Sequence, residues 1–301
     1  MRRWAQRRQV QVDKVRQFTG RPVFCITAGT GPRAIMFYKP HAHEPAPCAA
    51  CMNVLSKLLE GQGLDGTQPQ LPPDDVLSAL TISFIPDANP GGTERAPVPW
   101  WDGTQYTNEE FWVWMRGRDP RTGKMWERYD IWDIRQVDPK PETIGIVYER
   151  ISEHEYVEPN RHHKSSLFKL IFRALERREY ALFVSLHQTE FVGSMHDCMA
   201  ILPITFQEQP EELRQAEQEL AGHILESWRG LGGNPVPEIK PLGYTDVQAD
   251  YLRRAWGEIH RSIACVTTEV RNNSLLCPPS KQRALCEAAI WAAISWALER
   301  L

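Results

Sequence analysis

Short apolar runs alternate with helical patterns along this chain, and this alternation limits the possible folds more than any other feature of the sequence. The run at residues 34–38 lacks the polar and apolar alternation of a half-exposed strand, so we predict a central strand there that is covered on both faces. Strands that alternate with helices predict an α/β domain with a mixed, mostly parallel central sheet and helices on both faces. The predicted strands are residues 21–26, 34–38, 80–85, 181–186 and 263–268, and the predicted helices are residues 47–59, 165–178, 210–231, 249–262 and 281–301.

Two segments fall outside this alternation. Residues 1–19 are rich in arginine and nearly free of acidic side chains, and we expect a basic helical segment there, solvated or facing a partner, rather than a transit peptide. A single domain is expected over residues 20–301, with a tryptophan-rich insert at about residues 93–158. Because disordered segments are poor in aromatic residues, we expect the insert to be folded and to cover a site.

The composition argues against several classes of function. The net charge of -3 is unsuited to nucleic acid as the main partner, because neutralising phosphates requires a basic surface. No apolar stretch reaches the roughly 20 residues that span a bilayer, so no membrane association is expected. The cysteines number 7 and are scattered, which is typical of reduced thiols in a cytoplasmic protein.

Polar side chains that can bind a metal ion or transfer a proton follow several of the predicted strands. In open α/β sheets, ligands bind in the crevice outside the carboxyl ends of the strands. The pattern therefore predicts that these side chains meet at one edge of the sheet. They are His41, Glu44, Asn89, His187 and Glu269.

The tetrapeptide His41-Ala42-His43-Glu44 contains two of these side chains. A His and a Glu three residues apart can both point at one metal ion, and imidazole nitrogen with carboxylate oxygen suits Zn²⁺. Taken alone, the tetrapeptide fits a polar turn better than a metal site. The zinc interpretation depends on His187 and Glu269 reaching the same place.

These motifs, in this order and at about this spacing, resemble the zinc carboxypeptidases of the carboxypeptidase A type. The resemblance runs from about Gly20 to the C-terminus and implies the fold of that family. Each segment is weak alone, and together they are fairly specific. The matching segments are Gly20-Arg21-Pro22, His41-Ala42-His43-Glu44-Pro45-Ala46, Phe84-Ile85-Pro86 with Asn89-Pro90-Gly91-Gly92, Val184-Ser185-Leu186-His187 and Val266-Thr267-Thr268-Glu269-Val270-Arg271.

The resemblance implies a role for each side chain of the predicted centre. His41, Glu44 and His187 would hold one Zn²⁺ per chain, with an open position for water. Such a metal lowers the pKa of water and polarises a scissile carbonyl. Glu269 would take the proton of the attacking water and pass it to the leaving amine.

The resemblance also implies two arginines, one for the oxyanion and one for the terminal carboxylate. Sequence spacing supports them less well than it supports the metal ligands. The family places an arginine near the developing oxyanion, and Arg116 is the first candidate here and Arg118 the second. The family clamps the terminal carboxylate with an Asn-Arg pair, which Asn160 and Arg161 match in the segment Val157-Glu158-Pro159-Asn160-Arg161. In sequence, Asn160 is closer to His187 than the family's pattern leads one to expect. The alternative to the clamp is that Asn160 caps the helix that begins near Ser165.

The remaining substrate contacts leave alternatives open. His43 stands where the family often has a substrate-binding arginine, and it could also be a surface residue or a competing ligand. Tyr244, or otherwise Tyr251, corresponds to the family's mobile tyrosine. Arg253 and Arg254 fall near the region of the side-chain pocket, where a basic pocket would favour an acidic side chain; the blander alternative is a solvated helix face.

We therefore expect a zinc-dependent hydrolase that removes a C-terminal residue from a small peptide or peptide-like substrate. One alternative is an amidohydrolase or deacylase of the same superfamily that acts on an acylated amino acid or a natural-product intermediate. Another, from a different class, is a non-catalytic metal-binding module that kept the fold.

Overall fold

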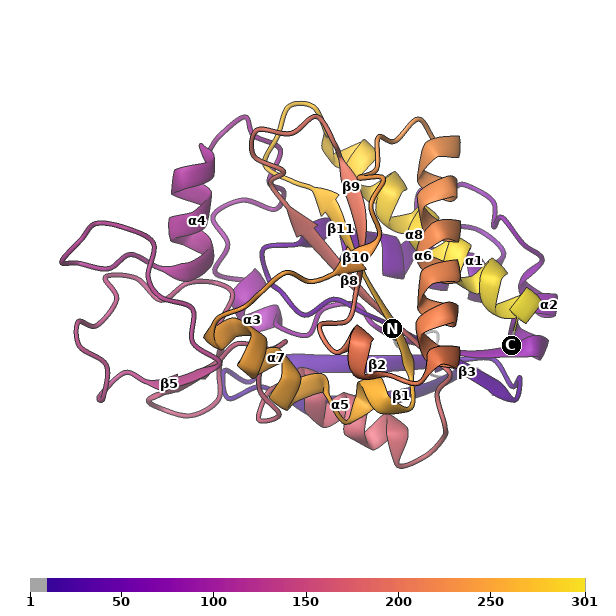
Figure 1. The fold of residues 1–301 in the computed structure, drawn as a ribbon, viewed down its shortest axis with the longest axis horizontal. Coiled ribbons are helices and arrows are strands. Elements are labelled where there is room, and N and C mark those ends of the chain that lie inside the picture. The colour runs from indigo at the N-terminus through magenta and orange to yellow at the C-terminus, as the bar shows by residue number, and fades with distance from the viewer. Residues whose placement is uncertain (1–9, 301) are drawn as a thin grey trace.

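A computed structural model describes residues 10–300 of the chain. Its centre is an eight-stranded mixed sheet with parallel pairing in the middle (Figure 1). Antiparallel strands flank the parallel centre on both sides. In spatial order the strands are β1 (Val10–Arg16), β2 (Pro22–Ala28), β4 (Leu80–Ile85), β3 (Arg33–Tyr38), β8 (Leu182–Thr189), β11 (Ala264–Arg271), β9 (Cys198–Leu202) and β10 (Lys240–Pro241).

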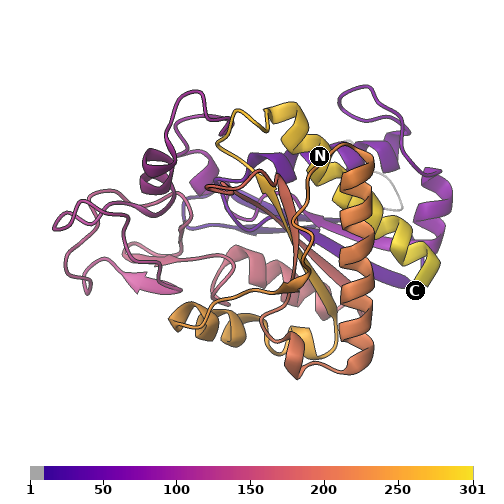
Figure 2. The ribbon, with the colours of Figure 1, turned by 45° about the horizontal axis from the view of Figure 1, so that its top comes forward.

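Helices cover the sheet on both faces, as Figures 1 and 2 show from two directions. One face packs against α1 (Pro45–Glu60), α2 (Pro73–Ala79), α6 (Glu211–Gly230) and α8 (Pro279–Arg300). The other face packs against α5 (Ser166–Leu175) and α7 (Val247–Trp256). Short 3₁₀ turns occur at Phe206–Glu208 and Ile259–Arg261. The predicted α/β class with a doubly covered sheet is confirmed. None of the helices in residues 10–300 has the length and hydropathy that crossing a membrane requires.

The tryptophan-rich region folds beside the sheet, at the left of Figure 1. It contains α3 (Pro90–Thr93), α4 (Asn108–Arg116) and a three-stranded sheet of β5 (Ile131–Asp133), β7 (Glu155–Val157) and β6 (Glu149–Arg150). Its aromatic side chains form two small cores, one around Trp101 and Phe111 and the other around Trp126 and Trp132. Burial of these large rings stabilises a region that has little regular secondary structure.

The helix expected for residues 1–19 is wrong over Val10–Arg16, and residues 1–9 lie outside the described part of the chain. Val10–Arg16 form β1, which pairs antiparallel with β2 along its whole length. Its charged residues suit an edge strand, because charge on an edge discourages pairing with other chains. Val15 still points into the core, which a solvated helix would not need.

The strands β8 and β11 extend beyond their predicted ends, to Thr189 and Arg271. His187 and Glu269 therefore lie inside strands rather than after them. A further strand, β9, was not predicted from the sequence; it is apolar and pairs antiparallel with β11. β9 lies beside Glu269, so it forms one wall of the site.

Glu217 of α6 has a fully buried side chain, which gives the fold a testable pH dependence. Its Oε1 accepts hydrogen bonds of 2.8 Å from the Cys265 amide and from Gln209 Nε2, while its buried Oε2 has no partner among the described residues. Burial raises the pKa of Glu217 from 4.5 to about 7. A higher pKa in the folded state means that folding favours the protonated acid, so the free energy of unfolding falls as pH rises from about 4.5 to about 7.

Glu217→Gln is therefore expected to stabilise the protein at pH 8 by up to about 3 kcal/mol, and by much less at pH 5. Thermal or denaturant unfolding at the two pH values measures the difference. Glu226→Gln, at an exposed position of the same helix, is the matched control and should change stability equally little at both. An equal effect of Glu217→Gln at pH 5 and pH 8 would contradict this assignment.

Candidate metal centre

The centre lies at the carboxyl ends of the parallel strands. His41 and Glu44 occupy the turn between β3 and α1, where Glu44 is the N-cap residue and Pro45 begins the helix. His187 and Glu269 are directly opposite each other in the parallel pairing of β8 and β11. Side chains at paired positions of neighbouring strands share a face of the sheet, so the register alone brings these two together.

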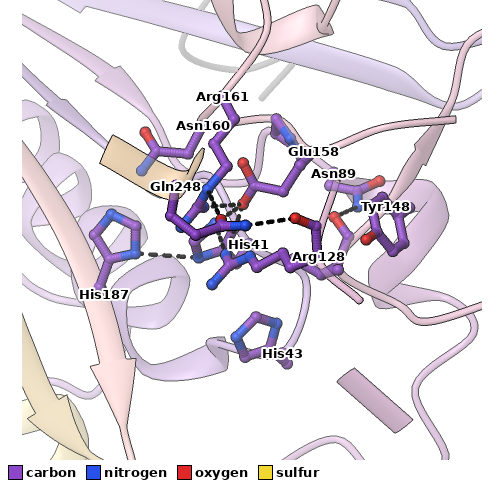
Figure 3. Close-up of polar contacts among 12 residues, drawn as sticks. His41, His43, Asn89, Arg128, Tyr148, Glu158, Asn160, Arg161, His187 and Gln248 are labelled. Carbon is purple, nitrogen blue, oxygen red and sulfur yellow. Dashed lines mark hydrogen bonds and ion pairs between the residues drawn. The ribbon is translucent and has the colours of Figure 1, made fainter. Parts of the chain in front are cut away.

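The side chains of His41, Glu44 and His187 converge in the buried interior. Figure 3 shows the His41 and His187 rings facing each other. His41 Nδ1 lies 2.8 Å from Glu44 Oε1, and His187 Nδ1 lies 3.1 Å from His41 Nδ1 and 3.2 Å from Glu44 Oε1. The Nε2 atoms of the two rings bond elsewhere, to Glu158 Oε1 and to Ser185 Oγ. Both Nδ1 atoms are therefore turned toward one shared point.

This donor set fits a zinc ion. Tetrahedral zinc with nitrogen and oxygen ligands places its donors roughly 3.3 Å apart, close to the separations observed here. Glu44 Oε2 is buried without a hydrogen-bond partner among the described residues, which is costly for a carboxylate in a metal-free protein. Burial alone would raise the pKa of Glu44, but His41 and His187 hold it well below its usual value.

Glu158 is a central residue of the site to which the sequence analysis gave no role. Its fully buried Oε1 accepts from His41 Nε2, from Arg128 Nη2 at 2.8 Å and from Arg161 Nη1 at 3.1 Å. Burial would raise its pKa, but Arg161, His41 and Arg128 hold that pKa well below the usual range. A carboxylate on the outer nitrogen of a ligand histidine fixes its tautomer and leaves Nδ1 free for the metal.

Glu269 reaches the site from β11. Its Oε2 is buried and has no hydrogen-bond partner among the described residues. Burial raises the pKa of Glu269 well above its usual value, and the carboxylates of Glu44 and Glu190 add to this effect. A carboxylate without a partner among the described residues, beside a cluster of side chains able to hold a metal ion, is able to take up a proton.

Arg128, which was not predicted from the sequence, reaches the centre in place of the two expected oxyanion candidates. Arg128 lines the central pocket and contacts Glu158. Arg116 is partly buried but is not among the pocket-lining residues; burial and the charge of Arg128 lower its pKa to about 10. Arg118 is half exposed and pairs with Glu142 at 3.7 Å.

A pocket of about 100 Å³ adjoins the centre, and Leu252 and Trp256 of α7 form part of its lining. His41, His187 and Glu269 line one end, together with Asn160, Arg161 and Tyr244. The alternative role for Asn160 as a helix cap is wrong, because the N-cap of α5 is Ser165. The apolar part is lined by Ile201, Leu202, Ile204, Leu242, Leu252 and Trp256.

The other predicted substrate residues divide into two groups. Tyr244 is 39% exposed, lines the pocket and lies under the Arg161 guanidinium, 5.9 Å from ring centroid to Cζ. His43 is not a surface residue, because it is 3% exposed; its Nε2 lies 3.5 Å from Glu44 Oε1 but it does not line the pocket (Figure 3). Burial holds the pKa of His43 well below its usual value, so the ring is neutral.

The basic side-chain pocket considered from the sequence is not formed. Arg253 pairs with Glu208, while Arg254 pairs with Asp130 and lies over the Tyr251 ring. Both arginines are exposed and neither lines the pocket. The solvated alternative for these two residues fits the structure.

Comparison with protein-family models and with curated proteins gives no match for this chain. Comparison with solved structures gives many, at low sequence identity. A metallo-carboxypeptidase from Burkholderia cenocepacia has a TM-score of 0.60 and 13% identity, covering 99% of this chain and 67% of the other. Thrombin-activatable fibrinolysis inhibitor has a TM-score of 0.56 and 11% identity, covering 100% of this chain and 71% of the other.

A metallo-carboxypeptidase from Pseudomonas aeruginosa, in complex with (2-guanidinoethylmercapto)succinic acid, has a TM-score of 0.54 and 12% identity, covering 98% of this chain and 66% of the other. The chain thus spans about two thirds of the length of the bacterial structures it matches. These likenesses confirm the predicted fold, which is that of the metallo-carboxypeptidases.

Proposed function

We propose that this chain, with its metallo-carboxypeptidase fold, is a zinc-dependent hydrolase that removes a C-terminal residue from a small peptide or peptide-like substrate. One observation carries the proposal. The Nδ1 atoms of His41 and His187 converge with Glu44 in a buried cluster, and the partnerless carboxylate of Glu269 lies opposite His187. Neither a binding module nor a structural protein needs a free carboxylate at that position.

The proposed reaction assigns a separate task to each side chain. His41, Glu44 and His187 would hold the zinc ion, and Glu158 keeps His41 in the tautomer that can bind it. When bound, zinc would polarise the scissile carbonyl and make a water molecule acidic. Glu269 takes the proton of the attacking water and donates it to the leaving amine.

Arg128 is our candidate for stabilising the negative charge that develops on the carbonyl oxygen. It lines the same pocket as His41 and Glu269, and its Nε is buried without a partner among the described residues. An unengaged donor at a preorganised cation is suited to an oxyanion, because the donor gains its hydrogen bond in the transition state.

Arg161, with Asn160 and Tyr244, is our candidate for binding the terminal carboxylate. Its guanidinium is 4% exposed and lines the pocket close to the metal ligands. A guanidinium binds a carboxylate through two parallel hydrogen bonds, and burial strengthens that interaction by excluding water. Such a clamp is useful to an enzyme that requires a free C-terminus.

The zinc-loaded protein is therefore expected to contain one zinc per chain and to hydrolyse N-benzoyl-glycyl-phenylalanine at least about 100-fold faster than its C-terminal amide, since the amide cannot form the charge-assisted pair. Steady-state kinetics and metal analysis measure both quantities. Removal of zinc by a chelator should abolish turnover, and added zinc should restore it. Equal rates on the free and blocked substrates would favour the amidohydrolase alternative, and a protein that binds less than one zinc would contradict the proposal.

The apolar part of the pocket supports a preference for a large uncharged side chain. Tyr38, Ser185, Thr267 and Ile201 form a row across four strands, one level below His187 and Glu269. The pocket wall also includes His260, whose pKa burial lowers to about 3, so that it is neutral. Among the residues of 10–300 that line the pocket, Glu269 is the only one with a carboxylate.

Substrates that end in phenylalanine or leucine should accordingly have kcat/KM values at least about 100-fold above those that end in lysine or glutamate, because this wall offers no partner for a buried charge. A series of dipeptides that differ only in the last residue measures the ratio. The guanidino ligand in the Pseudomonas aeruginosa structure makes the comparison with basic side chains informative. A preference for lysine would show that the pocket assignment is wrong.

A further inference from the structure

Gln248, on the first turn of α7, forms hydrogen bonds to both candidate arginines. Its Oε1 accepts from Arg161 Nε at 2.9 Å, and its Nε2 donates to the backbone carbonyl of Arg128 at 2.6 Å. An arginine nitrogen can only donate and a carbonyl oxygen can only accept, so the two partners fix the orientation of the amide. Figure 3 shows Gln248 between the two arginines.

Arg128 lies in chain without regular secondary structure and depends on such contacts for its position. The Tyr148 hydroxyl accepts a hydrogen bond from the Tyr129 amide at 3.2 Å. The same hydroxyl donates to the Glu127 carbonyl at 3.3 Å. Those bonds hold the residues on either side of Arg128. The bond from Gln248 is the one that holds the carbonyl of Arg128 itself.

Arg161 is held from two directions. Nη1 bonds to Glu158, and Nε bonds to Gln248, which together fix the plane of the guanidinium. The backbone of Gln248 is itself fixed, because its amide donates to the capping side chain of Asp246 at 2.9 Å. The neutral amide thus connects the Arg161 guanidinium to the Arg128 backbone without adding a charge to the site.

We propose that Gln248 is a positioning residue that fixes the distance between Arg128 and Arg161. The inference rests on the proposed function, in which Arg128 faces the scissile carbonyl and Arg161 faces the terminal carboxylate. The two groups of a peptide substrate are one residue apart, so the spacing of the arginines decides whether both can be bound at once. A displacement of about 1 Å at such a site is enough to lower the rate about 100-fold.

Two substitutions separate the two bonds of Gln248. Gln248→Met has a similar length and loses both bonds. Gln248→Glu keeps an acceptor for Arg161 but presents an oxygen to the Arg128 carbonyl, which cannot donate to it. Asp250→Ala, at an exposed position of the same helix turn, is the matched control. Zinc content and thermal unfolding of each variant show whether the centre and the fold remain intact.

With N-benzoyl-glycyl-phenylalanine as substrate, Gln248→Met is expected to raise KM and lower kcat, each about tenfold. Gln248→Glu is expected to lower kcat about tenfold and to leave KM within about threefold of the wild type, since Arg161 keeps its bond. Asp250→Ala should match the wild type. If Gln248 had only a structural role, the variants would differ in stability, but Gln248→Met would not change both kcat and KM while Gln248→Glu changes kcat alone.

A binding measurement tests the inference independently of turnover. Calorimetry compares N-benzoyl-phenylalanine with its C-terminal amide on each zinc-loaded protein. In Gln248→Met, the ratio of the Kd of the amide to the Kd of the carboxylate should fall about tenfold, whereas in Gln248→Glu this ratio should match that of the wild type. If the wild type binds the carboxylate with this dependence on Gln248 but hydrolyses nothing, the proposed reaction fails and the positioning role stands. The inference would be overturned if Gln248→Met had the kinetic constants and ligand affinities of the wild type. It would also be overturned if Gln248→Met and Gln248→Glu had the same constants.

Discussion

Glu269→Gln is expected to keep the zinc ion and to lower kcat by about 10³–10⁴. The amide has nearly the shape of the carboxylate, so the register of β11 with β8 and the packing around the residue should persist. It cannot, however, accept the proton of the attacking water or return one to the leaving amine. Because the change acts on the chemical step, KM should change little compared with kcat.

The measurement combines steady-state kinetics on N-benzoyl-glycyl-phenylalanine with zinc analysis of the same preparation. Glu190→Gln is the matched control, since Glu190 lies in the same charged environment but accepts a hydrogen bond from Trp112 Nε1 at 3.0 Å. That control should retain activity within about tenfold of the wild type. Full activity in Glu269→Gln, with zinc bound, would rule out Glu269 as the base.

The main strands were predictable from the sequence because burial on both faces leaves an unmistakable pattern. Residues 34–38 are apolar without interruption, and residues 80–85 are apolar apart from Thr81 and Ser83. The two segments form the parallel pair of β3 and β4. β1 was missed because an edge strand carries charged residues whose local pattern also fits a helix. Its assignment depends on pairing with β2, which is a tertiary property.

The candidate site was predictable to the extent that short spacing and strand order determine it. His41 and Glu44 are near in sequence, and His187 and Glu269 end up opposite each other once β8 and β11 are neighbours. Glu158 and Gln248 had no such signal, because their roles come from contacts with distant residues. Glu158 could have been noticed, since it lies two residues before Asn160 in the segment that contains the predicted carboxylate clamp.

The choice between Arg116 and Arg128 could not be made from the sequence, for a physical reason. Both lie in a region without clear periodicity, so the path of the chain decides which guanidinium approaches His41, Glu44 and His187. The structure directs Arg128 to Glu158 and into the pocket, whereas Arg116 ends α4 outside the pocket lining. The proposed oxyanion role thus moves from Arg116, expected from the sequence, to Arg128.

Arg128→Ala is accordingly expected to lower kcat by about 10²–10³, the usual cost of removing one oxyanion donor, while zinc stays bound. Glu158 keeps its bonds to His41 and Arg161 in this variant, so the ligand tautomer should survive. Arg116→Ala is the matched control and should remain within about threefold of the wild type. Added guanidinium ion should restore part of the activity of Arg128→Ala alone, because the cavity left by the side chain adjoins the pocket. A large loss in Arg116→Ala with guanidinium rescue, and none in Arg128→Ala, would return the role to Arg116.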